Sequence, residues 1–346
     1  MKDRGDVTMI KRLTITLVVV LSATMLLQAC GEKSQESVMK RMDKQLQEMK
    51  GYKTRAEMRM NTGKEEQVYQ IEVWHKKDDF YRVALSNEAD EKNNQIILKN
   101  EDGVFVVTPA LEKSFKFQSD WPENSSQSYL YQSLLNDIQQ DKESRFEVTD
   151  THYLFTTKTN YQSNNNLPYQ EIYVDKKTFT PVLVKVLDTD EKPVVEVKFE
   201  QFQLNPEFTE KDFALDDKHQ TDKEKAENTG EQTEQVFSIM YPEYTAGAEL
   251  LEEKEMTIES GTRLIMTYDG EKAFTLIQEH KDAVPSSANY TEVSGEMIDL
   301  GHSIGAISNN MIEWTYNGTD FYLASDQLTR EELIEVAKSV VMQDVK

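Results

Sequence analysis

The single cysteine of this 346-residue chain, Cys30, lies in a context that gives it a defined chemistry. Lys11 and Arg12 precede an apolar run over residues 13–29, and a polar stretch begins directly after the cysteine. A basic segment, a short apolar segment and a small residue before the cleavage point are typical of an export signal. The sequence therefore predicts a signal peptide over residues 1–29.

Leu27, Ala29 and Cys30 match a bacterial lipobox, in which the cysteine thiol receives a diacylglyceryl group and becomes the mature N-terminus. We expect a lipidated N-terminus and tether at residues 30–34, with fatty acids such as palmitate holding the protein on the extracytoplasmic face of the cell membrane. Two acyl chains anchor a protein stably where one does not. The alternatives are an uncleaved transmembrane anchor, for which residues 13–29 are short, and an unmodified cysteine.

The pentapeptide Gly301-His302-Ser303-Ile304-Gly305 matches the G-x-S-x-G pattern of a hydrolase nucleophile. That elbow needs a strand before it, a helix after it and a histidine later in the chain. No histidine follows His302, and the next residues lead toward a strand and an Asn-Gly turn. Glycines that flank a short connection explain the pattern better, so we expect the protein not to be an enzyme.

The composition and the other polar residues argue against several further classes of function. The five histidines are far apart, and the acidic runs lack the glycine and the alternating ligands of a calcium loop. A net charge of −23 argues against nucleic-acid binding, which needs clustered cations. We expect no metal, no other cofactor and no nucleic-acid partner.

The first element predicted after residues 30–34 is an amphipathic helix. Val38, Met42, Leu46 and Met49 form one apolar stripe, which predicts a helix over residues 34–50 that ends before Gly51. After Gly51 the apolar period changes to two, and short connections such as Asp102-Gly103 predict antiparallel pairing. The expected strands include 69–73, 80–85, 95–98, 104–108, 153–158, 169–174, 182–187 and 195–199, with a second helix over 126–140.

Residues 216–235 are almost entirely polar or charged, so they cannot form a core and are expected to be a linker. The linker separates a first domain at residues 35–215 from a small α+β domain at residues 236–346. In the second domain the sheet is expected first and the helix last. Thr329 and Glu332 form a capping box that opens this helix, whose apolar stripe runs to Val340 and Val341.

Methionine and aromatic residues are numerous in the first domain, and the strand pattern places the aromatics on one face. Methionine suits surfaces that adapt to varied apolar ligands. Packing in the core is the alternative explanation for most of these side chains. The candidate ligand-binding residues are Met42, Met49, Trp74, Phe80, Phe105 and Phe115.

Residues 70–122 resemble the central strands of the LolA family of lipoprotein carriers. The resemblance rests on Val73-Trp74, on Phe80-Tyr81-Arg82, and on the hairpin from Asp102-Gly103 to Pro109, and it continues through residues 197–213. It implies an unclosed antiparallel β-barrel lidded by helices, with an apolar cavity for lipid chains. The carriers have an arginine that helps to latch the lid, where this chain has Lys77 without the planar fork of arginine.

A lipid-anchored LolA-like domain followed by a second domain resembles the sporulation lipoproteins of endospore-forming bacteria. The resemblance implies a non-enzymatic envelope protein that binds an acyl chain, a lipoprotein or another apolar ligand, in sporulation or envelope assembly. The alternative is a sensor or adaptor that docks a membrane regulatory protein, in the manner of the envelope-stress regulator RseB. An open apolar cavity favours the first function. A filled barrel with an exposed apolar patch on the second domain favours the second.

Replacing Cys30 by serine should abolish lipidation, because Cys30 is the single cysteine available as acceptor. Cells that produce the Cys30→Ser protein and receive labelled fatty acid should accumulate an unlabelled precursor. Lipid labelling equal to that of the unaltered protein would contradict the lipoprotein assignment.

Overall fold

The computed structural model describes residues 33–61, 66–87, 91, 94–111, 113–117, 121, 127–161, 167–215, 239–258, 261–281, 290–301 and 303–342. The predicted signal peptide, Cys30 and the predicted linker at 216–235 lie outside these residues, so these assignments and the domain boundaries stay predictions. No helix in the described part of the chain is long and apolar enough to span a bilayer.

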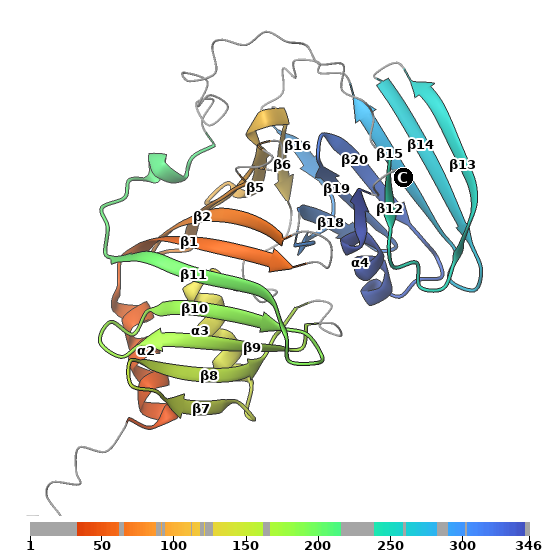
Figure 1. Cartoon of the computed structure of the whole chain (residues 1–346). Coiled ribbons are helices and arrows are strands. Elements are labelled where there is room, and N and C mark those ends of the chain that lie inside the picture. Colours follow the sequence, from red (N-terminus) through yellow and green to blue (C-terminus); the bar gives the residue numbers. More distant parts are fainter. Residues whose placement is uncertain are drawn as a thin grey trace, which may run out of the picture. The chain divides into compact units, whose positions relative to one another are not determined.

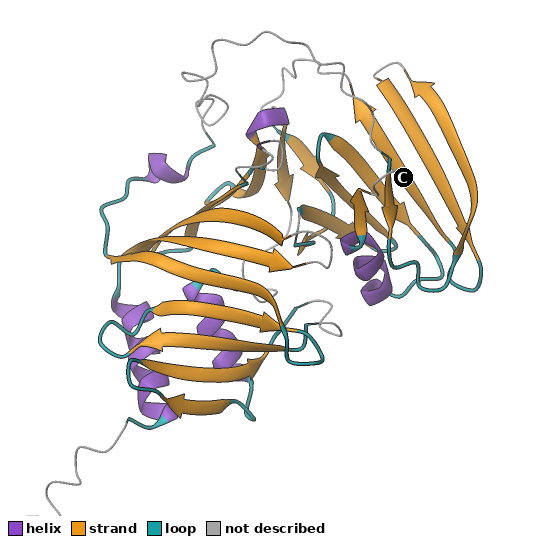
Figure 2. Cartoon of the chain, in the orientation of Figure 1, coloured by secondary structure: helices purple, strands orange, loops and turns teal. Residues whose placement is uncertain are grey.

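The described residues form a mostly antiparallel β structure with few helices (Figures 1 and 2). The larger sheet has the linear order β16-β6-β5-β4-β3-β2-β1-β11-β10-β9-β8-β7, and it is unclosed. Its neighbours are antiparallel except for β16, which pairs in parallel with β6. The strands are β1 (Gly51–Asn61), β2 (Glu66–Lys76), β3 (Phe80–Ser86), β4 (Gln95–Asn100), β5 (Gly103–Thr108), β6 (Lys113–Phe117), β7 (Arg145–Val148), β8 (His152–Lys158), β9 (Tyr169–Asp175), β10 (Pro181–Leu187), β11 (Pro193–Leu204) and β16 (Thr291–Val293).

Two helices belong to the first part of the chain, α2 (Gln35–Glu48) and α3 (Tyr131–Gln140). The first agrees with the predicted amphipathic helix, and Met42 and Met49 of its apolar stripe are buried. The second begins later than expected, because Leu130 has an extended backbone and no side chain caps the helix there. Gly51 begins β1 after Met49 and Lys50, and a Cβ at this position would lie 2.2 Å from the carbonyl oxygen of His75.

Aromatic side chains fill the space between α3 and the face of the sheet that carries Tyr52. The Tyr52 ring stacks on Phe202 with centroids 5.1 Å apart and meets Tyr131 of α3 edge-on at 6.4 Å. The Tyr131 hydroxyl donates a hydrogen bond of 2.6 Å to the carbonyl oxygen of Phe179. Tyr52 and Tyr131 are fully buried, so this side of the sheet is a packed core.

The second sheet has the order β13-β14-β15-β20-β19-β18-β17, and a two-stranded sheet pairs β12 with β21. Helix α4 (Arg330–Lys338) begins at the predicted capping box, with Thr329 accepting from the backbone of Glu332. The strands are β12 (Met240–Pro242), β13 (Glu249–Ile258), β14 (Gly261–Asp269), β15 (Phe274–Lys281), β17 (Glu296–Asp299), β18 (Ile304–Ser308), β19 (Met311–Tyr316), β20 (Thr319–Ala324) and β21 (Val340–Met342).

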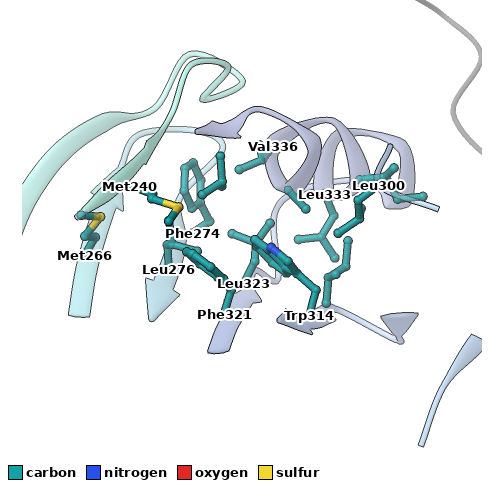
Figure 3. Close-up of a cluster of buried hydrophobic side chains, with 14 of the residues drawn as sticks. Met240, Met266, Phe274, Leu276, Leu300, Trp314, Phe321, Leu323, Leu333 and Val336 are labelled. Atoms are coloured by element: carbon teal, nitrogen blue, oxygen red, sulfur yellow. The ribbon is translucent and has the colours of Figure 1, made fainter. Parts of the chain in front are cut away.

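Helix α4 packs its apolar stripe on the second sheet. Leu333 and Val336 of α4 are buried beside Trp314 and Phe321, whose rings stack with centroids 4.9 Å apart (Figure 3). The prediction that the helix includes Val340 and Val341 is wrong, because α4 ends at Lys338 and β21 follows. Pairing with β12 gives this terminal segment its hydrogen bonds as a strand instead.

His75 offers a test of this packing, because its neutral ring is half-buried among aromatic rings. Its ring stacks on Tyr81 at 4.4 Å and lies 5.2 Å from Tyr52. Burial lowers the pKa of His75 to about 4, although the carbonyl of Phe80 and the charge of Asp79 act in the opposite direction. Between about pH 6.5 and pH 4 the unfolded chain therefore binds a proton that the folded chain does not.

The free energy of unfolding should consequently fall as the pH drops through this window, with His75 contributing up to roughly 3 kcal/mol of the loss. Carboxylates titrate in the same range, so the readout is the difference between the unaltered protein and His75→Phe, measured by urea unfolding at pH 7 and pH 4. The variant should show a smaller loss of stability. Equal losses in both proteins would exclude a buried neutral histidine.

Candidate functional site

Three of the six candidate ligand-binding residues share one face of β2–β5, which we call the Trp74 face. Cross-strand pairs place Trp74 beside Arg82, Arg82 beside Leu98, and Leu98 beside Phe105. Phe80 lies two residues before Arg82 and belongs to the same face. The Trp74 face is opposite to the face that carries Tyr52, since Tyr52 pairs with His75.

The chain's own residues 205–215 cover the Trp74 face. Phe208 stacks on Trp74 with ring centroids 5.4 Å apart, and Phe213 meets Phe80 edge-on at 5.7 Å. Leu215 packs against the buried cluster that includes Phe105. The segment includes the short helix η3 (Glu210–Phe213) and is attached through Asn100, whose side-chain amide donates to the carbonyl of Phe213 at 2.9 Å. These aromatics therefore already have apolar partners.

Cations flank Trp74 on this face. The Lys53 ammonium and the Arg82 guanidinium lie 4.5 and 4.7 Å from the centre of its ring. Glu72 is 2.9 Å from Lys53 and 3.9 Å from Arg82. Burial alone would raise the pKa of Glu72, but its hydrogen bond and ion pair with Lys53 outweigh this effect and lower the pKa. Arg55 also lies 3.3 Å from Glu72, so one carboxylate is shared by three cations beside Trp74.

The remaining candidates do not join this group. Phe115 pairs with Val106, which pairs with Ile97, on the face that also carries Val73 and Val83. The expectation that the aromatics share one face is therefore wrong, because Phe105 and Phe115 point to opposite sides of the sheet.

Met42 and Met49 are buried before β1, Met42 within α2 and Met49 directly after its last residue. At the expected latch position, the exposed Lys77 ammonium lies 3.4 Å from the carbonyl oxygen of Gln47 in the last turn of α2. A cation suits this end of a helix, where the carbonyl groups carry partial negative charge.

A hollow of about 410 Å³ lies on the solvent face of strands β1, β10 and β11, next to the start of β8. None of the six predicted residues lines it. Its apolar part comes from half-buried aliphatic and aromatic groups, and charged side chains complete the lining. The lining residues are Glu57, Arg59, His152, Val182, Leu183, Glu196, Lys198 and Phe199.

The strand register explains why charged and apolar groups meet in the hollow. Alternation along β1 and β11 turns Glu57 opposite Lys198 and Arg59 opposite Glu196, away from the buried Met58 and Val197. The register is interrupted between Pro181 and Leu183 of β10. A bulge of this kind re-aims side chains, and here it brings the apolar Val182 and Leu183 next to the charged positions.

Both carboxylates of the hollow take part in ion pairs, Glu57 with Arg59 of the lining and Glu196 with Lys185 outside it. The Arg59 guanidinium donates to Glu57 at 2.8 Å, and Lys185 lies 4.0 Å from Glu196. The hydrogen bond and the charge of Arg59 lower the pKa of Glu57, although its partial burial acts against this. A ligand would meet an apolar surface bordered by two carboxylates and two cations. Such a site suits an apolar body with a neutral or zwitterionic end.

The serine of the G-x-S-x-G pattern is held by hydrogen bonds within the fold. Ser303 is buried, its hydroxyl donates to the carbonyl oxygen of Thr315 at 2.6 Å, and it accepts from Gln95 at 3.1 Å. Strand β18 follows it where a nucleophile elbow needs a helix. His302 lies outside the described residues. Within the described residues no three His, Cys, Asp or Glu side chains are grouped as metal ligands, and the absence of a cofactor stays a prediction.

One part of the hollow was predictable from the sequence. The alternation of Val195, Val197 and Phe199 with Glu196 and Lys198 was visible and indicated a charged outer face. Which strands would lie beside this face was not visible, because pairing of β1 with β11 joins segments about 140 residues apart. The position of the bulge in β10 depends on the same pairing.

Solved structures with related features are distant from this chain. A chain of the MucA/MucB complex of Pseudomonas aeruginosa is similar over 89% of this chain and 98% of its own length, with 11% identity and a TM-score of 0.34. A LolA superfamily protein of Nitrosomonas europaea is similar over 53% of this chain and 98% of its own, with 11% identity and a TM-score of 0.31. TM-scores this low do not establish a common fold.

Sequence relatives give a firmer result. The sporulation protein YdcC of Bacillus subtilis (strain 168) is 44% identical over 338 residues, which cover 97% of this chain and 99% of the relative. A family model described as "Sporulation protein YdcC-like" matches residues 10–213. The expected relationship to sporulation proteins is confirmed. The chain belongs to the YdcC-like family of sporulation proteins.

Proposed function

We propose that this protein is a non-enzymatic envelope lipoprotein of sporulation, held at the extracytoplasmic face of the membrane by Cys30, that binds an apolar chain in the hollow on β1, β10 and β11. The hollow carries the proposal. Its volume of about 410 Å³ lies within the range of small-molecule sites, and it combines an apolar surface with a few charged groups. The acyl chain of a lipid or lipoprotein has the matching chemistry.

The hollow is a better site than the Trp74 face for a physical reason. A ligand on the Trp74 face would have to displace Phe208 and Phe213, and exposing each of these side chains costs about 1.5–3 kcal/mol. A ligand in the hollow displaces water from Val182 and Leu183 and gains the corresponding burial. We therefore assign the predicted aromatics Trp74, Phe80 and Phe105 to packing.

We also propose that residues 35–215 form an unclosed LolA-like barrel and that a small α+β domain follows the linker. Support comes from the sequence resemblance and from the linear order of antiparallel strands in the larger sheet. The aromatic core beneath α3 occupies the place where the resemblance implies a lipid cavity. The proposed ligand site therefore lies on the opposite face of the sheet.

Binding of an apolar probe tests the site in the hollow. The chain from Gly31 onward should bind both a fluorescent fatty acid and its uncharged methyl ester, because the apolar surface supplies the affinity. Leu183→Ser should weaken binding about five- to tenfold, as expected when a Leu side chain loses part of its apolar contact. Fluorescence titration measures the affinity, and longer probe chains should bind more tightly up to the length that the hollow holds.

Leu251→Ser is the matched control, since Leu251 is 66% exposed on β13 and does not line the hollow. It should leave probe binding unchanged. A folded chain that binds neither probe, or equal effects of the two substitutions, would contradict the proposal. Native mass spectrometry of the protein purified from its own membranes would then show whether any lipid accompanies it.

The alternative function, a sensor or adaptor that docks an envelope protein, has support of its own. The sheet face beneath α3 is filled by side chains, and the second sheet exposes Leu250, Leu251 and Met256. All three belong to β13, and large exposed apolar side chains along one strand are typical of an interaction site. Ligand binding and docking occupy different sheets, so one chain has room for both.

A further inference from the structure

The outer strand β13 differs from the other sheet edges of this protein. Among the described residues the larger sheet ends in β16 and β7, of three and four residues, and the smaller sheet ends in β17, of four. β13 has ten residues and pairs with β14 on one side, and no described strand pairs with its other side (Figure 1). Proteins usually keep exposed edges short, because unpaired backbone groups invite another strand.

The side chains of β13 are exposed along almost its whole length, including large apolar ones. Leu251 is 66% exposed, Leu250 42% and Met256 39%. Edge strands that prevent association usually carry charged or polar side chains at exposed positions such as these. Exposed apolar residues beside unpaired backbone groups indicate a surface that gains from being covered.

The charges of β13 define what can cover it. The strand carries four glutamates and one lysine, Lys254. Glu253 and Glu255 pair with Met266 and Leu264, which are buried, so both carboxylates lie on the core side of the sheet beyond its edge. Lys254 and Met256 lie on the other side. An added strand would therefore meet negative charge on one face and a mixed, partly apolar surface on the other.

We propose that β13 is a docking edge that accepts an extended basic segment of a partner protein as an additional strand of the second sheet. The backbone of the segment would pair with the free side of β13, and alternate Lys or Arg side chains would lie next to Glu253 and Glu255. Its intervening apolar side chains would lie beside Met256. The proposal goes beyond ligand binding at the hollow and gives the adaptor function a surface and a partner chemistry.

A second copy of this chain is a poorer occupant. Two β13 strands side by side would bring glutamates against glutamates, and like charges opposite each other destabilise a strand pair. The chain as a whole carries a net charge of −23, so two copies also repel each other over longer distances. A basic segment is attracted by the same charges.

A synthetic peptide that alternates lysine with valine tests the docking edge. The chain from Gly31 onward should bind it at physiological salt, where exposed non-specific charge effects are screened. The matched control is the same peptide with every second backbone nitrogen methylated, in both possible phases. This control keeps the charges but cannot complete the backbone pairing, so it should bind at least about tenfold more weakly. Fluorescence anisotropy measures both affinities.

Variants of the protein locate the binding. Glu253→Gln with Glu255→Gln should weaken the unmethylated peptide about fivefold through the loss of two cross-strand charge pairs. Glutamine keeps the size and hydrogen-bonding oxygen of each side chain, so the fold should be retained. Glu101→Gln with Glu207→Gln removes the same charge at exposed positions elsewhere and should have little effect. Leu183→Ser, in the hollow, should also leave peptide binding unchanged.

The outcomes separate edge pairing from its alternatives. No binding, equal affinity for plain and methylated peptides, or equal effects of the two double variants would overturn the proposal. Sedimentation should show a monomer without peptide, and a dimer that Glu253→Gln with Glu255→Gln alters would mean that a second copy occupies β13. Loss of probe binding at the hollow with normal peptide binding would refute only the proposed ligand site.

Discussion

The pairing of β1 with both β2 and β11 is the constraint on which the larger sheet depends. β1 joins the series β2–β6 to the series β11–β7, so its register fixes the faces of both halves. Tyr52, Ala56 and Met58 face the core, while Glu57 and Arg59 face solvent. A shift of one residue would exchange the two sets and bury ion-pairing side chains. The approach of Gly51 to the carbonyl of His75 allows this register at the start of the strand.

Local signals in the sequence predicted the elements that local interactions decide. The apolar stripe of α2, the Asp102-Gly103 hairpin between β4 and β5, and the capping box of α4 all occur in the structure. Each of these features involves residues within a few positions of one another. The Asn100 side chain even supports the hairpin by accepting from the backbone of Asp102. Such contacts can be inferred from spacing alone.

Features that depend on distant pairing could not be inferred in the same way. Phe105 and Phe115 lie in neighbouring strands, and only the register of β5 with β6 shows that they face opposite sides. The cover over Trp74 comes from Phe208, which is distant in the chain. The sequence did not predict β13, because all but its last residue are exposed. Apolar and polar residues therefore do not alternate along this strand. The hollow depends on β1, β10 and β11 together, so local sequence patterns could not predict which residues line it.

Electrostatics gives the two proposed surfaces different selectivity. The hollow has two carboxylates and two cations in its lining, so it is locally balanced within a chain of net charge −23. It can bind a neutral or zwitterionic apolar ligand without burying an unpaired charge, which would cost free energy. β13 has an excess of negative charge at an edge with which no described strand pairs, so a strand docking there would be selected for basic side chains. The same negative charge repels anionic lipid headgroups, so a lipid anchor at Cys30 would hold the protein at the membrane while leaving β13 accessible to a partner.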